Sequence, residues 1–156
     1  MSFVISGLPV DEFKPLFGLS DVALAERGVV RFRVDAKPGF PCRVTLEDAE
    51  PGETVLLLNY EHQPANTPYR ARHAIFVNEA ATEPRRAVDE VPGALRVRAA
   101  LSLRAYDQVG MMVEAELTPG SAIEPVIEKL FANPEVAYIH AHNAGRGCYA
   151  ARIDRA

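Results

Sequence analysis

Short segments in which apolar and polar residues alternate recur along most of the chain, and no long apolar run interrupts them. Alternation of this kind predicts β-strands, because successive side chains of a strand point to opposite faces. The most apolar of these segments, residues 54–61, is expected to be a central strand. The expected strands cover residues 2–6, 28–35, 42–46, 54–61, 72–77, 111–117, 136–142 and 148–153.

Two segments have the features of helices. Ser20 precedes residues 21–27 and is positioned to accept a hydrogen bond from the first helical turn. Ser121 precedes residues 122–132, where apolar side chains recur at the three- and four-residue spacing of one helix face. Glu124 follows Ser121 by three residues, so we expect these two side chains to form a capping box.

Residues 95–106 have two interpretations that the sequence leaves open. Alternation over the whole stretch predicts one strand, whereas Pro92 suits the first turn of a short helix, which a strand would follow from about residue 100. Residues 78–90 are polar and are expected to form an exposed connection. About eight strands and two or three helices, without regular βαβ alternation, indicate an α+β fold with a mainly antiparallel sheet and a C-terminal β-hairpin, in a single domain over residues 1–156.

Composition restricts the classes of partner that fit the chain. A net charge of −4 and scattered basic residues exclude the basic patch that a nucleic-acid-binding surface requires. The N-terminal residues lack the features of a signal peptide, and no segment is a candidate membrane span, so we expect a cytoplasmic protein with no membrane partner. Cys42 and Cys148 lie outside any CxxC pair and are expected to be reduced thiols.

The C-terminal hairpin concentrates the residues that can carry chemistry. Residues 136–153 contain two of the four histidines, one of the two cysteines and two arginines. With a strand over residues 136–142, the side chains of Tyr138, His140 and His142 share one face. Two imidazoles at this spacing can place a base beside an acid or hold a metal ion, so His140 and His142 are candidate catalytic groups.

The position of the hairpin loop decides which residues join this face. A loop over residues 143–147 would place Cys148 opposite His142 and would bring Arg152 to the same face, whereas a loop one residue shorter would turn them away. Cys148 is then a candidate nucleophile or a spectator thiol, and Arg152 is a candidate for binding an anionic substrate. Arg146 lies between two glycines of this loop and either helps to bind an anion or belongs to a turn that requires glycine.

Further polar residues are candidates for binding the same small anionic molecule. Asn143 begins the hairpin loop. Tyr60 and His62 share a face at the end of the apolar strand, where they either line a cleft or emerge into solvent. Arg72 and His73 follow a proline-containing loop, where they either clamp a carboxylate or phosphate or form a solvated, ion-paired start of a strand.

A zinc site is the alternative to a site for an organic anion. Four side chains have nitrogen or sulfur atoms suited to zinc: His62, His140, His142 and Cys148. Their spacing matches neither HExxH nor paired CxxC motifs, so we assign no residue as a metal ligand and no cofactor. The motifs of serine hydrolases, P-loop proteins and Rossmann dinucleotide-binding proteins are absent as well.

Four phrases of the sequence carry a resemblance to a known family: DAKPGFPCRVTLEDAEPGE over residues 35–53, LLLNYEHQPANTPYRARHAIFV over 56–77, LRAYD over 103–107 and VAYIHAHNAGRGCYAARIDR over 136–155. They resemble a bacterial family known as domain of unknown function 1203, over nearly the whole chain, and the last phrase is the most distinctive. The resemblance implies a soluble, single-domain bacterial protein. It implies no reaction, cofactor or catalytic residue.

The residues therefore support three hypotheses of function. The first is an enzyme that acts on a small anionic molecule at the hairpin face, with His140 or His142 as general acid or base. The second is a non-enzymatic module that binds or senses such an anion. The third is a structural protein whose histidines are hydrogen-bonded core groups, and the burial and hydrogen bonding of His140 and His142 distinguish it from the first two. The sequence favours an anion site with possible catalytic use.

Overall fold

A computed structural model describes all residues, 1–156, and contains nine strands, three α-helices and three 3-10 helices. The strands are β1 (Phe3–Ser6), β2 (Val30–Arg33), β3 (Thr54–Gln63), β4 (Ala71–Asn78), β5 (Arg86–Val88), β6 (Leu101–Tyr106), β7 (Met112–Thr118), β8 (Tyr138–Asn143) and β9 (Tyr149–Arg155). The helices are η1 (Val10–Glu12), η2 (Lys14–Leu16), α1 (Asp21–Ala25), α2 (Gly93–Arg96), η3 (Gly120–Ala122) and α3 (Ile123–Phe131). None of them is long and apolar enough to cross a membrane.

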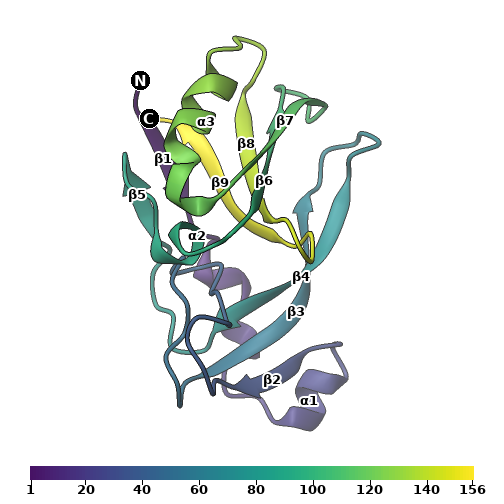
Figure 1. Cartoon of the computed structure of the whole chain (residues 1–156). Helices are drawn as coiled ribbons and strands as arrows, with labels where there is room; N and C mark the ends of the chain where they lie inside the picture. The colour runs from purple at the N-terminus through teal and green to yellow at the C-terminus, as the bar shows by residue number, and fades with distance from the viewer.

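The strands form two antiparallel sheets (Figure 1). The six-stranded sheet has the order β5-β1-β9-β8-β6-β7, and the three-stranded sheet has the order β2-β3-β4. β9, the last strand of the chain, therefore lies between β1, the first strand, and β8. The long β3–β4 ribbon rises from the smaller sheet and runs beside the β8–β9 hairpin. The predicted α+β fold with a mainly antiparallel sheet and a C-terminal hairpin is confirmed.

One face of the six-stranded sheet is apolar and is covered by α3 (Figure 1). The period of two along each strand sends alternate side chains into this core, and the helix contributes side chains three and four residues apart. The fully buried members include Leu101, Leu103, Ile139, Ile153, Ile123, Ile127 and Leu130. Burying such a side chain contributes roughly 1.5–3 kcal/mol. The opposite face of this sheet is free to carry polar residues.

A second core lies against the three-stranded sheet. Leu56 of β3 and Ile75 and Val77 of β4 are fully buried in it, together with Leu24 of α1. Tyr149 of β9 belongs to the same core, so the hairpin of the larger sheet packs directly on the smaller sheet. The two cores thus position the polar face of β8 against the β3–β4 ribbon.

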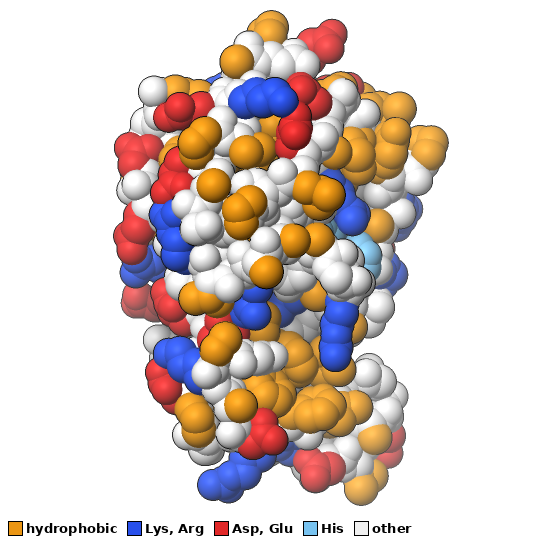
Figure 2. Space-filling view, viewed as in Figure 1, with side chains coloured by type: hydrophobic (Ala, Val, Ile, Leu, Met, Phe, Trp, Pro, Cys, Tyr) orange, Lys and Arg blue, Asp and Glu red, His pale blue; other side chains and the backbone are white.

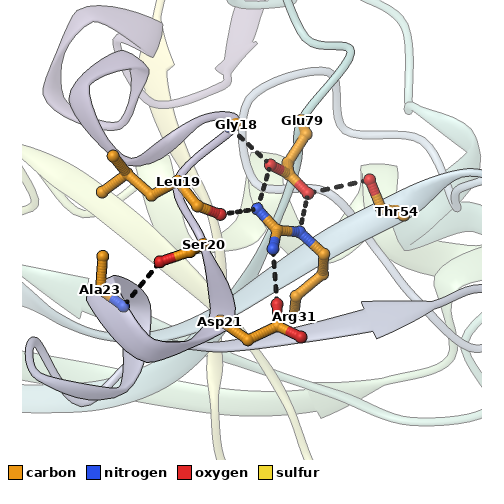
Figure 3. Close-up of polar contacts among 8 residues, drawn as sticks. All are labelled: Gly18, Leu19, Ser20, Asp21, Ala23, Arg31, Thr54 and Glu79. Carbon is orange, nitrogen blue, oxygen red and sulfur yellow. Dashed lines mark hydrogen bonds and ion pairs between the residues drawn. The ribbon is translucent and has the colours of Figure 1, made fainter.

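A network around Arg31 fixes α1 and β2 to the neighbouring strands (Figure 3). The Arg31 guanidinium donates to Glu79 at 2.7 Å and to Asp21 at 2.6 Å. At the start of α1, the Ser20 hydroxyl oxygen accepts a hydrogen bond from the backbone N–H of Ala23 at 3.1 Å, which confirms the predicted N-cap. Arg31 therefore joins the helix, its own strand and the end of β4 in one place.

The start of α3 differs from the prediction. η3 precedes the helix, so Ala122 occupies the N-cap position and no side chain caps it. The expected capping box of Ser121 and Glu124 is wrong, because the 3-10 turn moves the helix start beyond Ser121. The Glu124 carboxylate accepts hydrogen bonds from Arg96 of α2 instead.

Three other segments test the strand assignments. Residues 42–46 form no strand: only Cys42 makes an isolated bridge, to Phe76, and residues 43–45 form a turn that leads to Leu46 at a positive φ of 57°. Residues 78–90 contain β5, which the polarity of the segment concealed. For residues 95–106 the second interpretation is confirmed, because α2 follows Pro92 and β6 begins at Leu101.

Candidate metal centre

The polar face of β8 carries one pair of histidines. The pleat of this strand turns Tyr138, His140 and His142 to one face and places Ile139 and Ala141 in the core under α3. The predicted shared face is therefore confirmed. His140 is 3% exposed and His142 is 0% exposed, so the pair lies between the two sheets and not on an open surface.

The β3–β4 ribbon supplies the other two histidines. Pairing between the two strands is regular up to Tyr60 opposite His73 and is interrupted between Tyr60 and Gln63, so His62 lies in the irregular segment. The His62 ring stacks on the His73 ring with centroids 4.6 Å apart. The centroid of the His62 ring also lies 4.9 Å from that of the His142 ring. All four histidines of the chain thus form one cluster, although they come from distant parts of the sequence.

Three tyrosines enclose this histidine cluster. The Tyr149 ring stacks on His62 with centroids 5.2 Å apart and meets His140 edge-on at the same distance. Tyr106 and Tyr138 flank His140, with centroid distances of 5.2 and 5.3 Å. These aromatic rings bury much of the cluster, so each buried ring nitrogen depends on a partner inside it.

Three of the imidazoles have ring nitrogens that lie close together. One ring nitrogen each of His62, His73 and His142 lies within 4.8 Å of the other two. Nδ1 of His142 lies 2.9 Å from the carbonyl oxygen of Gly147 and donates to it, which leaves the lone pair of Nε2 free. Tetrahedral zinc with nitrogen ligands at about 2.0–2.1 Å needs those nitrogens roughly 3.4 Å apart. To bind one ion, these nitrogens would have to move closer together, and the stacked rings of His62 and His73 would have to tilt so that their lone pairs point to the same position.

Most of the buried ring nitrogens have no hydrogen-bond partner. These atoms are Nδ1 and Nε2 of His62, Nδ1 of His73, Nδ1 of His140 and Nε2 of His142. Leaving a buried polar group unpaired costs roughly 1–3 kcal/mol, and in native proteins such a group indicates an ion, a water molecule or a functional role. The hypothesis that the histidines are only hydrogen-bonded core groups does not account for these atoms.

Burial keeps the cluster uncharged. Desolvation lowers the pKa of His62 to about 4, that of His142 to about 3 and that of His140 to about 2. It also lowers the pKa of His73. At neutral pH the four imidazoles therefore hold the lone pairs that a metal ion requires.

Arginine supplies the positive charge beside the cluster. Arg104 of β6 lies directly opposite His140 in the β6–β8 ladder, and its charge lowers the pKa of all four histidines. Its guanidinium forms no ion pair and makes one long contact, from Nε to the Ser102 hydroxyl at 3.5 Å. Arg152 of β9 also lies opposite His140, but it forms an ion pair with Asp154 at 2.8 Å. Figure 2 shows histidine reaching the surface with lysine or arginine side chains around it.

Cys148 lies apart from the three convergent nitrogens. A bulge in the β8–β9 ladder pairs His142 with Tyr149, so the expected position of Cys148 opposite His142 is wrong. The Cys148 sulfur instead accepts hydrogen bonds from Arg43 Nη2 at 3.3 Å and from Asn143 Nδ2 at 3.4 Å. The thiol and the amide of Asn143 therefore form a separate contact at the base of the hairpin loop.

Three other candidates also lie outside the cluster. Arg72 is exposed and donates to the Glu61 carboxylate at 2.9 Å, which is the ion-paired alternative weighed for this residue. Arg146 is exposed at the tip of the hairpin loop. The Tyr60 ring packs against Phe13 with centroids 5.8 Å apart, and burial raises its pKa to about 12.

Sequence reasoning assigned no role to Arg104, Tyr106 and Tyr149, which the structure places at the cluster. The alternation over 101–106 already puts Arg104 and Tyr106 on one face of a strand. The missing information was that this strand pairs with β8. Tyr149 follows Cys148 directly, so it lies in the hairpin segment that already contained candidate residues. The bulge that places it opposite His142 depends on tertiary contacts and could not be predicted.

Two surface hollows lie elsewhere. One encloses about 310 Å³ and is lined mainly by polar and acidic residues, among them Glu47, Asp48, Glu50 and Glu53. Two of these acids are already ion-paired, Glu50 with Lys37 and Asp48 with Arg98. Neither this hollow nor a second one of about 300 Å³ is lined by a histidine.

Comparison with known proteins gives one match. A family described as "Protein of unknown function (DUF1203)" matches residues 39–155. No curated protein and no solved structure matches the chain. The matched residues include all four histidines, the three tyrosines around them and Arg104.

Proposed function

The chain belongs to the family of proteins of unknown function DUF1203, and from its site we propose that it binds a divalent transition-metal ion of the zinc class through His62, His73 and His142. The observation that carries the proposal is the proximity of three imidazole nitrogens, within 4.8 Å of one another, in a cluster whose buried ring nitrogens are mostly unpaired. Imidazole suits zinc and its neighbours in the first transition row. Three protein ligands leave one tetrahedral position open, which is the arrangement of catalytic zinc sites and not of structural ones.

The surroundings of His142 support its role as a ligand. Metal-binding histidines usually donate their second ring N–H to a carbonyl or carboxylate, which fixes the ring and its tautomer. The carbonyl of Gly147 serves this purpose for Nδ1 of His142. In this proposal His142 is therefore a ligand and not the general acid or base that the sequence suggested.

The other members of the zinc set weighed from the sequence take different roles. His140 packs in the same cluster, but its ring centroid lies 6.3 Å from that of His142, and it is not one of the three convergent residues. Cys148 has its sulfur engaged by Arg43 and Asn143. The sequence suggested His73 as an anion-binding residue and not as a metal ligand, and in this proposal it becomes the third ligand.

Titration of metal-free protein with Co²⁺ tests the proposal. We expect about one ion per chain, with the visible absorption of tetrahedral Co²⁺, and displacement of Co²⁺ by Zn²⁺. His62→Gln, His73→Gln and His142→Gln should each weaken binding by more than the roughly 10–100-fold that loss of an outer-shell partner costs. His140→Gln and Cys148→Ser should retain Co²⁺ affinity, which separates the three-histidine set from the set weighed from the sequence.

Far-ultraviolet circular dichroism and thermal unfolding of each metal-free variant control for loss of the fold. The proposal is overturned if the folded wild-type protein binds no Co²⁺ at micromolar concentrations. It is also overturned if folded H142Q binds as tightly as the wild type, or if H140Q and C148S lose as much affinity as the three ligand variants.

A further inference from the structure

We propose that the open position of this metal receives a small oxyanion, a carboxylate or phosphate group, and that a second oxygen of the same group binds the guanidinium of Arg104. The inference rests on the metal site proposed above and specifies the class of molecule that the site takes. It also assigns Arg104 as the residue that selects an oxyanion over other metal ligands.

Charge balance is the first argument. Three neutral imidazoles leave a divalent ion uncompensated, and Arg104 adds a further positive charge without an ion-pair partner. The charged side chains that lower the pKa of the neutral histidines are Arg104, which acts on all four, and Arg152, which acts on His140; no carboxylate offsets them. Partly buried charge of one sign is costly unless an opposite charge accompanies it. An anion shared by the metal and Arg104 would neutralise both.

The position of Arg104 is the second argument. In the β6–β8 ladder Arg104 lies opposite His140 and Ser102 lies opposite His142, so Arg104 is diagonal to a proposed ligand on the same face of the sheet. Side chains at such diagonal positions are close enough for long residues to act together. The planar guanidinium fork matches the spacing of two oxygens of one carboxylate or phosphate group.

Access and size are the third argument. His73 is the least buried of the three ligands, and the space-filling view shows histidine at the surface among basic side chains (Figure 2). The proposal therefore places the entry of the anion on the side of the half-buried His73. The tyrosines that pack on His62 and His140 limit the space, so the site selects a small group or the end of a larger molecule.

Anion titrations of the Co²⁺-loaded protein test this inference. Acetate and inorganic phosphate are the two oxyanion probes, and chloride is a metal ligand that has no second oxygen to pair with the guanidinium fork. We expect both oxyanions to change the Co²⁺ spectrum of the wild-type protein. Arg104→Gln should weaken oxyanion binding roughly 10–100-fold, as expected for the loss of hydrogen bonds to a charged group. Arg104→Lys keeps the charge but loses the guanidinium fork. It should therefore weaken oxyanion binding, while the affinity for chloride stays within about twofold.

Arg86→Gln is the matched control. Arg86 lies on β5, the far edge strand of the larger sheet, so this substitution removes the same charge away from the site. If R104Q and R104K bind Co²⁺ normally and bind acetate and phosphate as tightly as R86Q does, the oxyanion inference is overturned and the metal site stands. The same holds if neither oxyanion perturbs the wild-type spectrum. Failure of the wild-type protein to bind Co²⁺ removes both proposals. Preference for phosphate over acetate, or the reverse, identifies which oxyanion the site is built for.

Discussion

Replacing Glu79 by glutamine should remove the centre of the network that fixes α1 and β2 to the smaller sheet (Figure 3). The Glu79 carboxylate accepts hydrogen bonds from Arg31 Nε at 2.7 Å and Arg31 Nη2 at 3.0 Å. It also accepts from the Gly18 backbone N–H at 3.0 Å and the Thr54 hydroxyl at 2.8 Å. The Glu79 side chain is only 12% exposed, so water replaces little of what the substitution removes.

The expected loss follows from these contacts. A hydrogen bond to a charged group contributes roughly 1.5–3 kcal/mol, and breaking a buried ion pair costs roughly 3–5 kcal/mol. Glu79→Gln keeps one acceptor oxygen, and Arg31 keeps its pair with Asp21 at 2.6 Å, so the loss should be below the second range. We expect a decrease of about 2–3 kcal/mol in the free energy of unfolding. For a chain of this size that corresponds to a fall in Tm of roughly 5–10 °C.

Urea denaturation followed by circular dichroism measures this loss. Glu90→Gln is the matched control: the Glu90 carboxylate accepts two hydrogen bonds of 2.8 Å from Arg85, but its side chain is 60% exposed. An exposed pair contributes about 0–1 kcal/mol, so E90Q should remain close to the wild type. Equal losses in E79Q and E90Q would show that burial does not set the strength of this network.

The remaining predictions concern acid, backbone conformation and a buried arginine. The hydrogen bonds from Arg31 are the main cause that lowers the pKa of Glu79 from 4.5 to about 2. The unfolded chain therefore binds the proton more tightly than the folded protein, so this part of the stability is present above pH 4.5 and is lost as the pH falls from about 5 toward 2. Over this range the urea midpoint of E79Q should change less than that of the wild type. Gly110 has a φ of 89° and an added Cβ would lie 2.4 Å from the Ala65 Cβ, whereas Gly52 has a φ of 93° with nothing within 4 Å. Both alanine variants carry the left-handed penalty of roughly 1–2 kcal/mol, and G110A should lose roughly 1–3 kcal/mol more in urea denaturation; equal losses would contradict the steric argument. Arg43 is 3% exposed and its Nε donates to the Tyr149 carbonyl at 2.8 Å, so Arg43→Gln should lose at least about 2 kcal/mol in the same assay, and an unchanged urea midpoint would refute a stabilising role.

The features that follow from local periodicity could be predicted from the sequence. The shared face of Tyr138, His140 and His142 is one example, because it depends only on the pleat of one strand. The Ser20 cap is another, because the hydroxyl and the N–H that it binds lie three residues apart. In both cases the neighbours along the chain contain the needed information.

The composition of the histidine cluster could not be predicted in the same way. His62 and His73 meet His142 only because the β3–β4 ribbon packs against the β8–β9 hairpin, and no periodic signal records which sheets touch. The bulge that exchanges Cys148 for Tyr149 opposite His142 is likewise a tertiary feature. A shift of one residue in a ladder moves every side chain beyond it to the other face. A difference of one residue in the predicted pairing therefore changes which residues lie opposite the histidines.

Two incorrect assignments have a common cause in short turns. Ser121 has the sequence of a capping residue, yet η3 places it inside a 3-10 turn. Residues 42–46 alternate like a strand, yet the left-handed conformation of Leu46 bends the backbone there. Both conformations are held by contacts with distant segments: the Gly120 N–H donates to Arg98, and the carbonyl of Leu46 accepts from Ala94. Propensity within the segment is too weak to compete with such contacts.

The position of β9 in the larger sheet has a consequence for synthesis on the ribosome. Until this last strand emerges, β1 can pair only with β5, and β8 only with β6. Tyr149, which closes the wall beside His62 and His140, arrives with the same strand. Because pairing of β1 with β9 joins opposite ends of the chain, it belongs to the slow, non-local steps of folding. Binding of an ion at the proposed site is therefore expected only after β9 has joined the sheet, and a chain truncated before Tyr149 should bind Co²⁺ more weakly.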